Sequence, residues 1–239
     1  MVPGACLCDT VDMDRSLPPL IFDLDGTLTD SKPGILGCLV KTLEERGLPV
    51  PASLEGFIGP PVEEWVAYLL PEGTREDHAA LARDYRACYD REGWSNNAVY
   101  PGVRAMLEAL KEAEFPLYVC TSKHEHFAVR ILDRFELGPL FSAIYGDKIE
   151  YASHRKADLL ARVLAERGLN ADTAWMIGDR SFDFEAARAN GVRSLAAGWG
   201  YGSAAEWAQA DALAATPAEV MGLVAGHTAA RTRRPQVLA

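Results

Sequence analysis

Short apolar runs alternate with stretches of helical periodicity over most of the chain. PPLIFD at 18–23 and FPLYVCT at 115–121 have the continuous apolar pattern of buried strands. After such runs, apolar residues recur three and four positions apart, as Val103, Met106 and Leu110 do, which is the spacing of one helix face. The same patterns predict further strands at 141–146, 173–179 and 192–198 and further helices around 128–135, 159–164 and 182–191. Strands and helices that alternate in this way predict a parallel sheet with helices on both faces.

The segment from residue 31 to 97 has a different pattern, without a strand-like run. PGILGCLVKTLEERG at 33–47 has Pro33 at its start, Gly47 at its end and apolar residues at helical spacing. A helical pattern continues from about 61 to 93, with a break at 71–73. We therefore predict a Rossmann-like three-layer α/β core formed by residues 1–30 and 98–239, with a small helical domain, residues 31–97, inserted after the first strand.

Composition and charge limit the classes of partner that this chain is expected to bind. The net charge of -10 argues against a nucleic-acid scaffold, because binding the phosphate backbone needs a basic face. No apolar run approaches the ~20 residues that span a bilayer, and the N-terminus lacks the pattern of a signal peptide. Five cysteines at irregular spacing suit reduced thiols in a cytoplasm, where we expect this chain, and Cys6 and Cys8 are expected to be inert. The basic tail RTRRPQVLA is expected to be solvated and poorly ordered.

Two pairs of acidic residues follow apolar strands. Asp23 and Asp25 end the first strand, and Asp179 and Asp183 follow the strand at 173–179. Open α/β sheets bind ligands at the carboxyl ends of their strands. Four carboxylates there would repel one another without a cation, and oxygen ligands favour Mg²⁺. Alternatively, Asp23 and Asp25 form a turn, Asp179 caps the next helix and Asp183 faces solvent.

Two other segments offer groups for an anion. Thr121 and Ser122 end the strand at 115–121, where a hydroxyl could bind a phosphoryl oxygen. Lys156 lies near the start of a helix, where the macrodipole disfavours a cation, so that we expect it to pair with an anion. A solvated surface lysine is the alternative.

In order and spacing, DLDGT at 23–27, Thr121, Lys156 and GDRSFD at 178–183 resemble the haloacid dehalogenase superfamily, in its aspartate-nucleophile phosphatase branch. The resemblance implies that Asp23 is a nucleophile, that Asp25 is the general acid and base, and that Thr121, Ser122 and Lys156 bind the phosphoryl group. It implies Mg²⁺ held by Asp23, the backbone carbonyl of Asp25 and Asp179, with Asp183 nearby. Members of the family often have the dipeptide Lys-Pro where the phosphate-binding lysine lies, whereas this chain has HRKADLL at 154–160. Arg155 and Lys148 are therefore alternative candidates to Lys156.

In this family the inserted helical domain is a cap that closes over the site and reads the leaving group. FIGPP at 57–61 resembles the substrate-facing turn of phosphoglycolate phosphatases and bacterial 5′-nucleotidases, which makes Gly59 and Pro60 candidates for specificity. Lys32 and Arg180 are further candidates. His124 and His126 are expected to be exposed, because at that spacing they do not share a helix face. The cap aromatic residues Trp65, Tyr85, Tyr89 and Trp94 are expected in the core of the cap.

The function expected from this resemblance is hydrolysis of a small phosphorylated metabolite, of the phosphoglycolate or nucleoside-monophosphate type. A β-phosphoglucomutase-like phosphotransferase, a phosphonatase and a non-catalytic binding module of the same fold are the alternatives. The phosphonatase would need a reactive cap lysine, for which neither Lys32 nor Lys41 has a fitting context. The binding module would have no need for the acid at Asp25. Either a monomer or a homodimer is compatible with the sequence.

Overall fold

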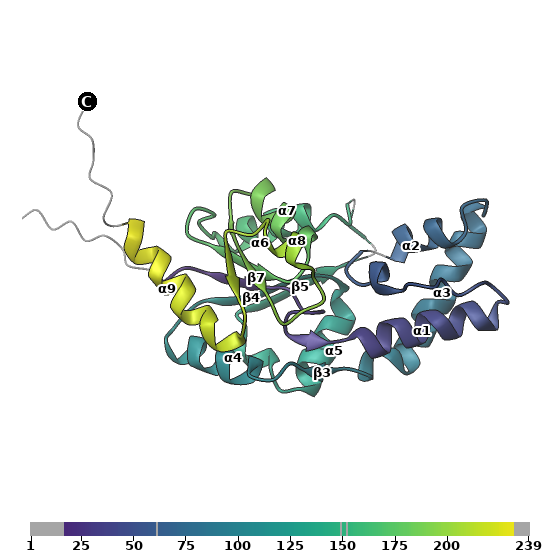
Figure 1. The fold of residues 1–239 in the computed structure, drawn as a ribbon, viewed down its shortest axis with the longest axis horizontal. Coiled ribbons are helices and arrows are strands. Elements are labelled where there is room, and N and C mark those ends of the chain that lie inside the picture. Colours follow the sequence, from purple (N-terminus) through teal and green to yellow (C-terminus); the bar gives the residue numbers. More distant parts are fainter. Residues whose placement is uncertain (1–16, 61, 149, 152, 232–239) are drawn as a thin grey trace, which may run out of the picture.

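The computed structural model describes residues 17–60, 62–148, 150–151 and 153–231. Its centre is a parallel sheet with the strand order β5-β4-β1-β6-β7-β8 (Figure 1). The strands are β1 (Leu20–Phe22), β4 (Leu117–His124), β5 (Ala143–Asp147), β6 (Trp175–Gly178), β7 (Arg193–Ala197) and β8 (Ala212–Ala214). Strands β4 and β5 lie on one side of β1, and β6, β7 and β8 lie on the other, so that β1 and β6 are neighbours.

Strand β1 shows how the sheet divides the core between its two faces. Leu20 and Phe22 belong to the hydrophobic cluster on one face, and Ile21 belongs to the cluster on the other, as the alternation of a strand requires. Helices α4 (Val103–Glu112), α5 (Glu125–Arg134) and α9 (Val220–Arg231) cover the first face, and α6 (Lys156–Arg167) and α7 (Ser181–Ala189) cover the second (Figure 1). The predicted three-layer α/β sandwich is confirmed.

The inserted helices lie beside the carboxyl end of the sheet (Figure 1). They are α1 (Lys32–Glu45), α2 (Val62–Leu69) and α3 (Arg75–Arg91), and they enclose a hydrophobic cluster of their own. Thr74 begins α3 with a reciprocal capping box to Asp77, which satisfies backbone donors at the helix start. We call this unit the cap, as in the sequence analysis.

A two-stranded antiparallel ribbon lies where the chain passes between core and cap. Strands β2 (Thr29–Asp30) and β3 (Ala98–Val99) form it, so that the outgoing and returning segments lie side by side. The ribbon coincides with the boundaries drawn from the sequence, at 30/31 and 97/98. That division into two domains stays a prediction.

Several elements differ from the sequence-based expectations. Strand β4 continues to His124, whereas the apolar pattern ends at residue 121, because a register shift against β5 carries the pairing on through polar residues. The short β8, the ribbon, α8 (Ala204–Trp207) and α9 were not predicted. Cys6, Cys8 and the tail from residue 232 lie outside the described residues. Within the described residues, no helix combines the length and apolarity that crossing a membrane requires.

Candidate active site

The candidate site begins where two neighbouring parallel strands end. Asp23 follows β1 and Asp179 follows β6, and the Asp23 amide donates a hydrogen bond of 2.9 Å to the carbonyl of Ile177 in β6. Asp183 lies in the first turn of α7, which directly follows Asp179 and Arg180. The sheet therefore brings together three acidic residues that are up to 160 positions apart in the sequence.

These three carboxylates form a buried cluster. Oxygen atoms of Asp23, Asp179 and Asp183 lie within 4.8 Å of one another. Lys156, the first residue of α6, places Nζ 2.8 Å from Oδ1 of Asp23 and also forms an ion pair with Asp183. Lys156 was expected to pair with an anion, and its partners here are these two carboxylates.

Electrostatics at the cluster suit a cation. Burial raises the pKa of the Asp179 carboxyl well above its ordinary value, and repulsion from Asp183 and Asp23 adds to this effect. Burial also raises the pKa of Asp183 to about 6, although the ammonium of Lys156 acts in the opposite direction. A divalent cation among these oxygens would favour the ionised forms, and an all-oxygen donor set is what Mg²⁺ prefers. The residues present therefore fit the predicted metal.

Glycine is required around the cluster because the backbone approaches the carboxylates closely. Gly26 has a φ of +87°, and a Cβ built there would lie 2.4 Å from Oδ2 of Asp179. A Cβ at Gly178 would lie 2.1 Å from Cγ of Asp183. Both distances are well below van der Waals contact. Thus the glycines in DLDGT and IGD make space for the acidic side chains.

The segment that follows β7, including α8, also holds Asp179 by hydrogen bonds. The Tyr201 amide donates to Oδ2 of Asp179 over 2.7 Å, and Nε1 of Trp207 donates to its backbone carbonyl over 3.0 Å. The Tyr201 hydroxyl donates to Oδ1 of Asp30 over 2.8 Å and accepts from the backbone amides of Ser31 and Lys32. Tyr201 therefore connects the carboxylate cluster to the passage into the cap, a link the sequence analysis missed.

Asp25 does not join the carboxylate cluster. We expected four carboxylates at one cation, but the Asp25 side chain pairs with Lys123, whose Nζ lies 3.1 Å from Oδ2 of Asp25. Lys123 occupies the part of β4 that the apolar pattern did not predict. Burial acts to lower the pKa of Lys123, but the Asp25 carboxylate and the Tyr89 hydroxyl outweigh it, so the pKa is raised. The metal contact implied for Asp25 was through its backbone carbonyl, and it stays a prediction.

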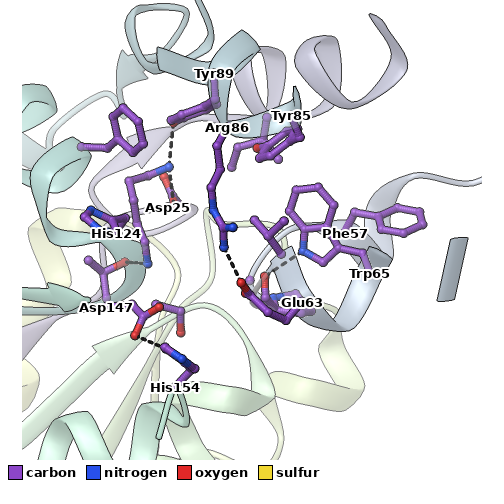
Figure 2. A pocket seen from close by; sticks show the side chains of 18 of the residues that line it. Asp25, Phe57, Glu63, Trp65, Tyr85, Arg86, Tyr89, His124, Asp147 and His154 are labelled. Carbon is purple, nitrogen blue, oxygen red and sulfur yellow. Dashed lines mark hydrogen bonds and ion pairs between the residues drawn. The ribbon is translucent and has the colours of Figure 1, made fainter. Parts of the chain in front are cut away.

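Asp23 and Asp25 line a cavity of about 540 Å³ between core and cap. Figure 2 shows Asp25 in this cavity together with Tyr85 and Tyr89 of the cap. Thr121 and Ser122 line it from the end of β4, and Thr121 is buried. Five aromatic side chains line it as well, four from the cap and one from α5: Phe57, Trp65, Tyr85, Tyr89 and Phe127. As expected, Trp65, Tyr85 and Tyr89 are part of the cap core, yet they also face this cavity.

Ionisable side chains in the cavity wall lie in pairs. Arg86 of α3 forms an ion pair with Glu63 of α2, and Nδ1 of His154 lies 2.7 Å from Oδ1 of Asp147 (Figure 2). His124, expected to be exposed, is half-buried and lines the cavity, and burial lowers its pKa. His126 is exposed at the same cavity. Arg86, Glu63, Asp147 and His154 were not among the candidate residues predicted from the sequence.

The four specificity candidates separate into two groups. Gly59 and Pro60 line the cavity. Lys32 does not, because it pairs with Glu55 at the surface, 3.4 Å away. Arg180 also lies outside the lining, and instead joins core to cap by donating from Nη1 to the carbonyl of Ile58 over 2.7 Å.

The two rivals of Lys156 lie away from the carboxylates. Lys148 pairs with Glu125 at 2.8 Å, and Arg155 is exposed at the N-cap of α6. Of these three basic residues, the geometry therefore places only Lys156 against Asp23 and Asp183.

Comparison with known proteins agrees with this architecture. Residues 20–197 match the model of the haloacid dehalogenase-like hydrolase family. A haloacid dehalogenase-like hydrolase from Streptococcus pneumoniae is similar in structure, with a TM-score of 0.79 and 33% identity over 87% of this chain and 98% of that one. The chain belongs to the haloacid dehalogenase-like hydrolase family, and the predicted resemblance is confirmed.

The curated relatives have different names. The chain is 38% identical over 187 residues to the tyrosine-protein kinase PtkA of Mycobacterium tuberculosis, a match that covers 77% of this chain but only 63% of that protein. It is 38% identical over 189 residues to a 5′-nucleotidase of Pseudomonas aeruginosa, covering 78% and 85%. A phosphoglycolate phosphatase of Aquifex aeolicus is 32% identical over 76% of this chain and 85% of its own length.

Proposed function

We propose that this chain is a Mg²⁺-dependent phosphatase that hydrolyses a small phosphate monoester through an aspartyl-phosphate intermediate. The observation that carries the proposal is the buried cluster of Asp23, Asp179 and Asp183, with Lys156 against it and with Asp23 lining a cavity. Such a concentration of buried acidic groups is costly for stability alone, and groups of this kind concentrate at functional sites.

Asp23 is the nucleophile in this proposal. One of its carboxylate oxygens forms a bond to phosphorus while the bond between phosphorus and the leaving oxygen breaks, and water then attacks the aspartyl phosphate and releases inorganic phosphate. Asp25 donates a proton to the leaving oxygen in the first step and accepts one from water in the second. Both side chains line the cavity, which supports these roles.

The remaining polar groups bind charge. Asp23, Asp179 and Asp183 would hold Mg²⁺, together with the backbone carbonyl of Asp25. When bound, the ion neutralises the carboxylates and stabilises negative charge on the phosphoryl oxygens. Thr121, Ser122 and Lys156 bind phosphoryl oxygens and orient the group toward Asp23.

The cavity favours a nucleoside monophosphate over phosphoglycolate as the substrate type. Its volume of about 540 Å³ and its aromatic lining suit a leaving group that contains a flat ring. A glycolate would fill little of it and would bring a second negative charge. Among the described lining residues, the two basic side chains other than histidine, Lys123 and Arg86, already pair with Asp25 and Glu63.

Phosphate release from a panel of monophosphates tests the proposal. We expect Mg²⁺-dependent turnover, with nucleoside monophosphates ahead of 2-phosphoglycolate, and loss of turnover on chelation. Glucose 1-phosphate and glucose 6-phosphate in the panel would reveal a mutase-like transferase by their interconversion without phosphate release. ATP with a tyrosine peptide would reveal the activity for which the mycobacterial relative is named. Binding without turnover of any compound would favour the binding module. A cytoplasmic location and a monomeric or homodimeric state stay predictions.

A further inference from the structure

Lys123 is a buried cation at the contact between core and cap. It lies in β4, near the end of the strand, and only 6% of its side chain is exposed. A buried ammonium needs compensating partners, because removing it from water costs several kcal/mol. Its partners come from both domains: Asp25 from the core and Tyr89 from cap helix α3.

The contact with Asp25 distinguishes the two oxygens of that carboxylate. Oδ2 lies 3.1 Å from Nζ of Lys123. Oδ1 is buried and has no hydrogen-bond partner among the described residues. Since a buried, unpaired carboxylate oxygen is unfavourable, we infer that Oδ1 gains its partner when a substrate is bound beside it. Lys123 therefore holds the carboxylate by one oxygen and leaves the other to the reaction.

The contact with Tyr89 depends on the position of the cap. Nζ of Lys123 donates to the Tyr89 hydroxyl over 2.7 Å and lies 4.5 Å from the centre of its ring. Tyr89 is itself buried and packs edge-on against Phe127 of α5, with ring centroids 5.1 Å apart. A cap that moves away from the core takes Tyr89 with it, and water then reaches Lys123 and screens its attraction for Asp25.

We propose that Lys123 is a positioning residue that directs Oδ1 of Asp25 toward the leaving group, and that Tyr89 makes this arrangement depend on the closed cap. This inference rests on the proposed function, in which Asp25 transfers the proton. It assigns to Lys123 and Tyr89 no contact with the phosphoryl group. Proton transfer is thereby confined to the state in which the cavity is covered, which limits attack by water on a substrate that is only partly bound.

The test compares leaving groups in the full-length chain. Lys123→Met should lower kcat by about 10²-fold for the best alkyl monophosphate, because misplacement of a catalytic group by about 1 Å has effects of this size. For p-nitrophenyl phosphate, whose leaving group needs little protonation, we expect a loss of less than about 10-fold in the phosphorylation rate. KM should stay within about threefold for both substrates if Lys123 does not bind them.

Two further variants separate the parts of the proposal. Tyr89→Phe keeps the ring over the ammonium but removes the hydroxyl, so we expect a smaller loss, about 3- to 10-fold, again greater for the alkyl substrate. Lys123→Arg keeps the charge and should recover part of the rate lost in Lys123→Met. Lys41→Met is the matched control, since it also removes an ion pair between a lysine and a carboxylate, that of the cap residue Lys41 with Glu92, which lies outside the cavity. It should behave as wild type.

Several outcomes would overturn the inference. Equal losses of the phosphorylation rate for both substrates, or a rise in KM alone, would show that Lys123 binds the phosphoryl group or acts only in folding. Wild-type behaviour of Tyr89→Phe would overturn the coupling to the cap. This result would count even if Lys123→Met failed to fold. A wild-type chain without Mg²⁺-dependent phosphate release would instead overturn the proposed function, and the inference with it.

Discussion

The floor and the wall of the cavity are built in different ways. We use the word floor for Asp23, Asp179 and Asp183 with Lys156, which all lie at the ends of strands or starts of helices in the core. Of these four residues Asp23 lines the cavity, and the other three surround Asp23 outside the lining. The wall consists of aromatic residues and the Arg86–Glu63 pair, which belong to the cap except for Phe127 of α5. Charge is unbalanced in the floor, where carboxylates outnumber the cation, and largely balanced in the wall.

This difference separates chemistry from selectivity. The sheet edge holds its acidic groups at a fixed spacing, which suits a reaction on one common group, the phosphoryl group. The cap contributes shape and paired charge, which suit recognition of a variable leaving group. Asp25 is placed between the two, because its backbone belongs to the floor while its side chain is held by Lys123, which touches the cap.

The largest loss of activity is expected from a substitution of Asp23, the proposed nucleophile in the floor. Asp23→Asn should abolish phosphate release on every substrate, because the amide retains the shape of the side chain but cannot attack phosphorus. Near-unchanged circular dichroism and thermal melting would show that the fold persists. Substantial turnover by this variant would exclude Asp23 as the nucleophile.

Asp25 lies between the floor and the wall, and Asp25→Asn should lower the phosphorylation rate by different factors for different substrates. An alkyl phosphate needs a proton on its leaving oxygen, so its phosphorylation rate should fall about 10²- to 10⁴-fold. For p-nitrophenyl phosphate the first step should be slowed less than the second, and stopped-flow absorbance should show a burst. If both substrates lose the phosphorylation rate equally, Asp25 serves positioning rather than proton transfer.

Removal of the metal tests the floor as a whole. EDTA should remove activity and Mg²⁺ should restore it, whereas Ca²⁺ should inhibit because its larger and more flexible coordination shell misplaces Asp23. Full activity after exhaustive chelation would contradict the cation site.

The pH dependence of Mg²⁺ affinity follows from the raised pKa values in the floor. Because the pKa of Asp183 is raised to about 6, and that of Asp179 is raised as well, protons compete with Mg²⁺ as the pH falls toward and below that value. Affinity should therefore fall by about tenfold or more per pH unit below 6, with proton release on binding. Calorimetric titration in buffers of different ionisation enthalpy measures both, and affinity independent of pH between 5 and 7 would contradict this account.

In the wall, an unpaired cation should change the preferred substrate. Glu63→Gln would leave Arg86 without its carboxylate, so kcat/KM for 2-phosphoglycolate should rise about 10-fold relative to that for a nucleoside monophosphate. Glu64→Gln, on the same helix but outside the cavity lining, is the matched control and should leave the ratio unchanged. An unchanged ratio in Glu63→Gln would remove Arg86 from the account of selectivity.

The smallest change is expected for Tyr201, which connects the floor to the segment at which the chain enters the cap. Tyr201→Phe removes the hydrogen bonds of the hydroxyl to Asp30, Ser31 and Lys32. The free energy of unfolding should fall by about 1–3 kcal/mol, because one buried and two half-buried partners lose their bonds. Urea denaturation measures this change, and an unchanged midpoint would show that the link adds nothing to stability.

The sequence was informative about the core and the floor. Apolar strands followed at once by acidic residues indicate both the sheet and the edge at which ligands bind, so Asp23, Asp179 and Asp183 could be placed together before the structure. The sequence favoured Lys156 but left Arg155 and Lys148 as alternatives, since all three basic residues lie within the short segment 148–156, and the geometry separates them.

The sequence was much less informative about the wall. Tyr89 and Arg86 lie on a helix whose packing decides which side chains face the cavity, and helical spacing does not reveal the partner of each face. Lys123 was missed because β4 continues past its apolar run. Its position two residues after Thr121, within a strand, would place both on one side of the strand, but that signal requires knowing where the strand ends.

Direct detection of the intermediate tests the central claim. Asp25→Asn would be mixed with Mg²⁺ and p-nitrophenyl phosphate, quenched during the burst, reduced with borohydride and examined by peptide mass spectrometry. An acyl phosphate on Asp23 would be reduced to homoserine at that position, with no change at Asp179 or Asp183, and Asp23→Asn would show no such product. The account predicts this conversion in step with the burst, and a burst without modification of Asp23 would contradict it.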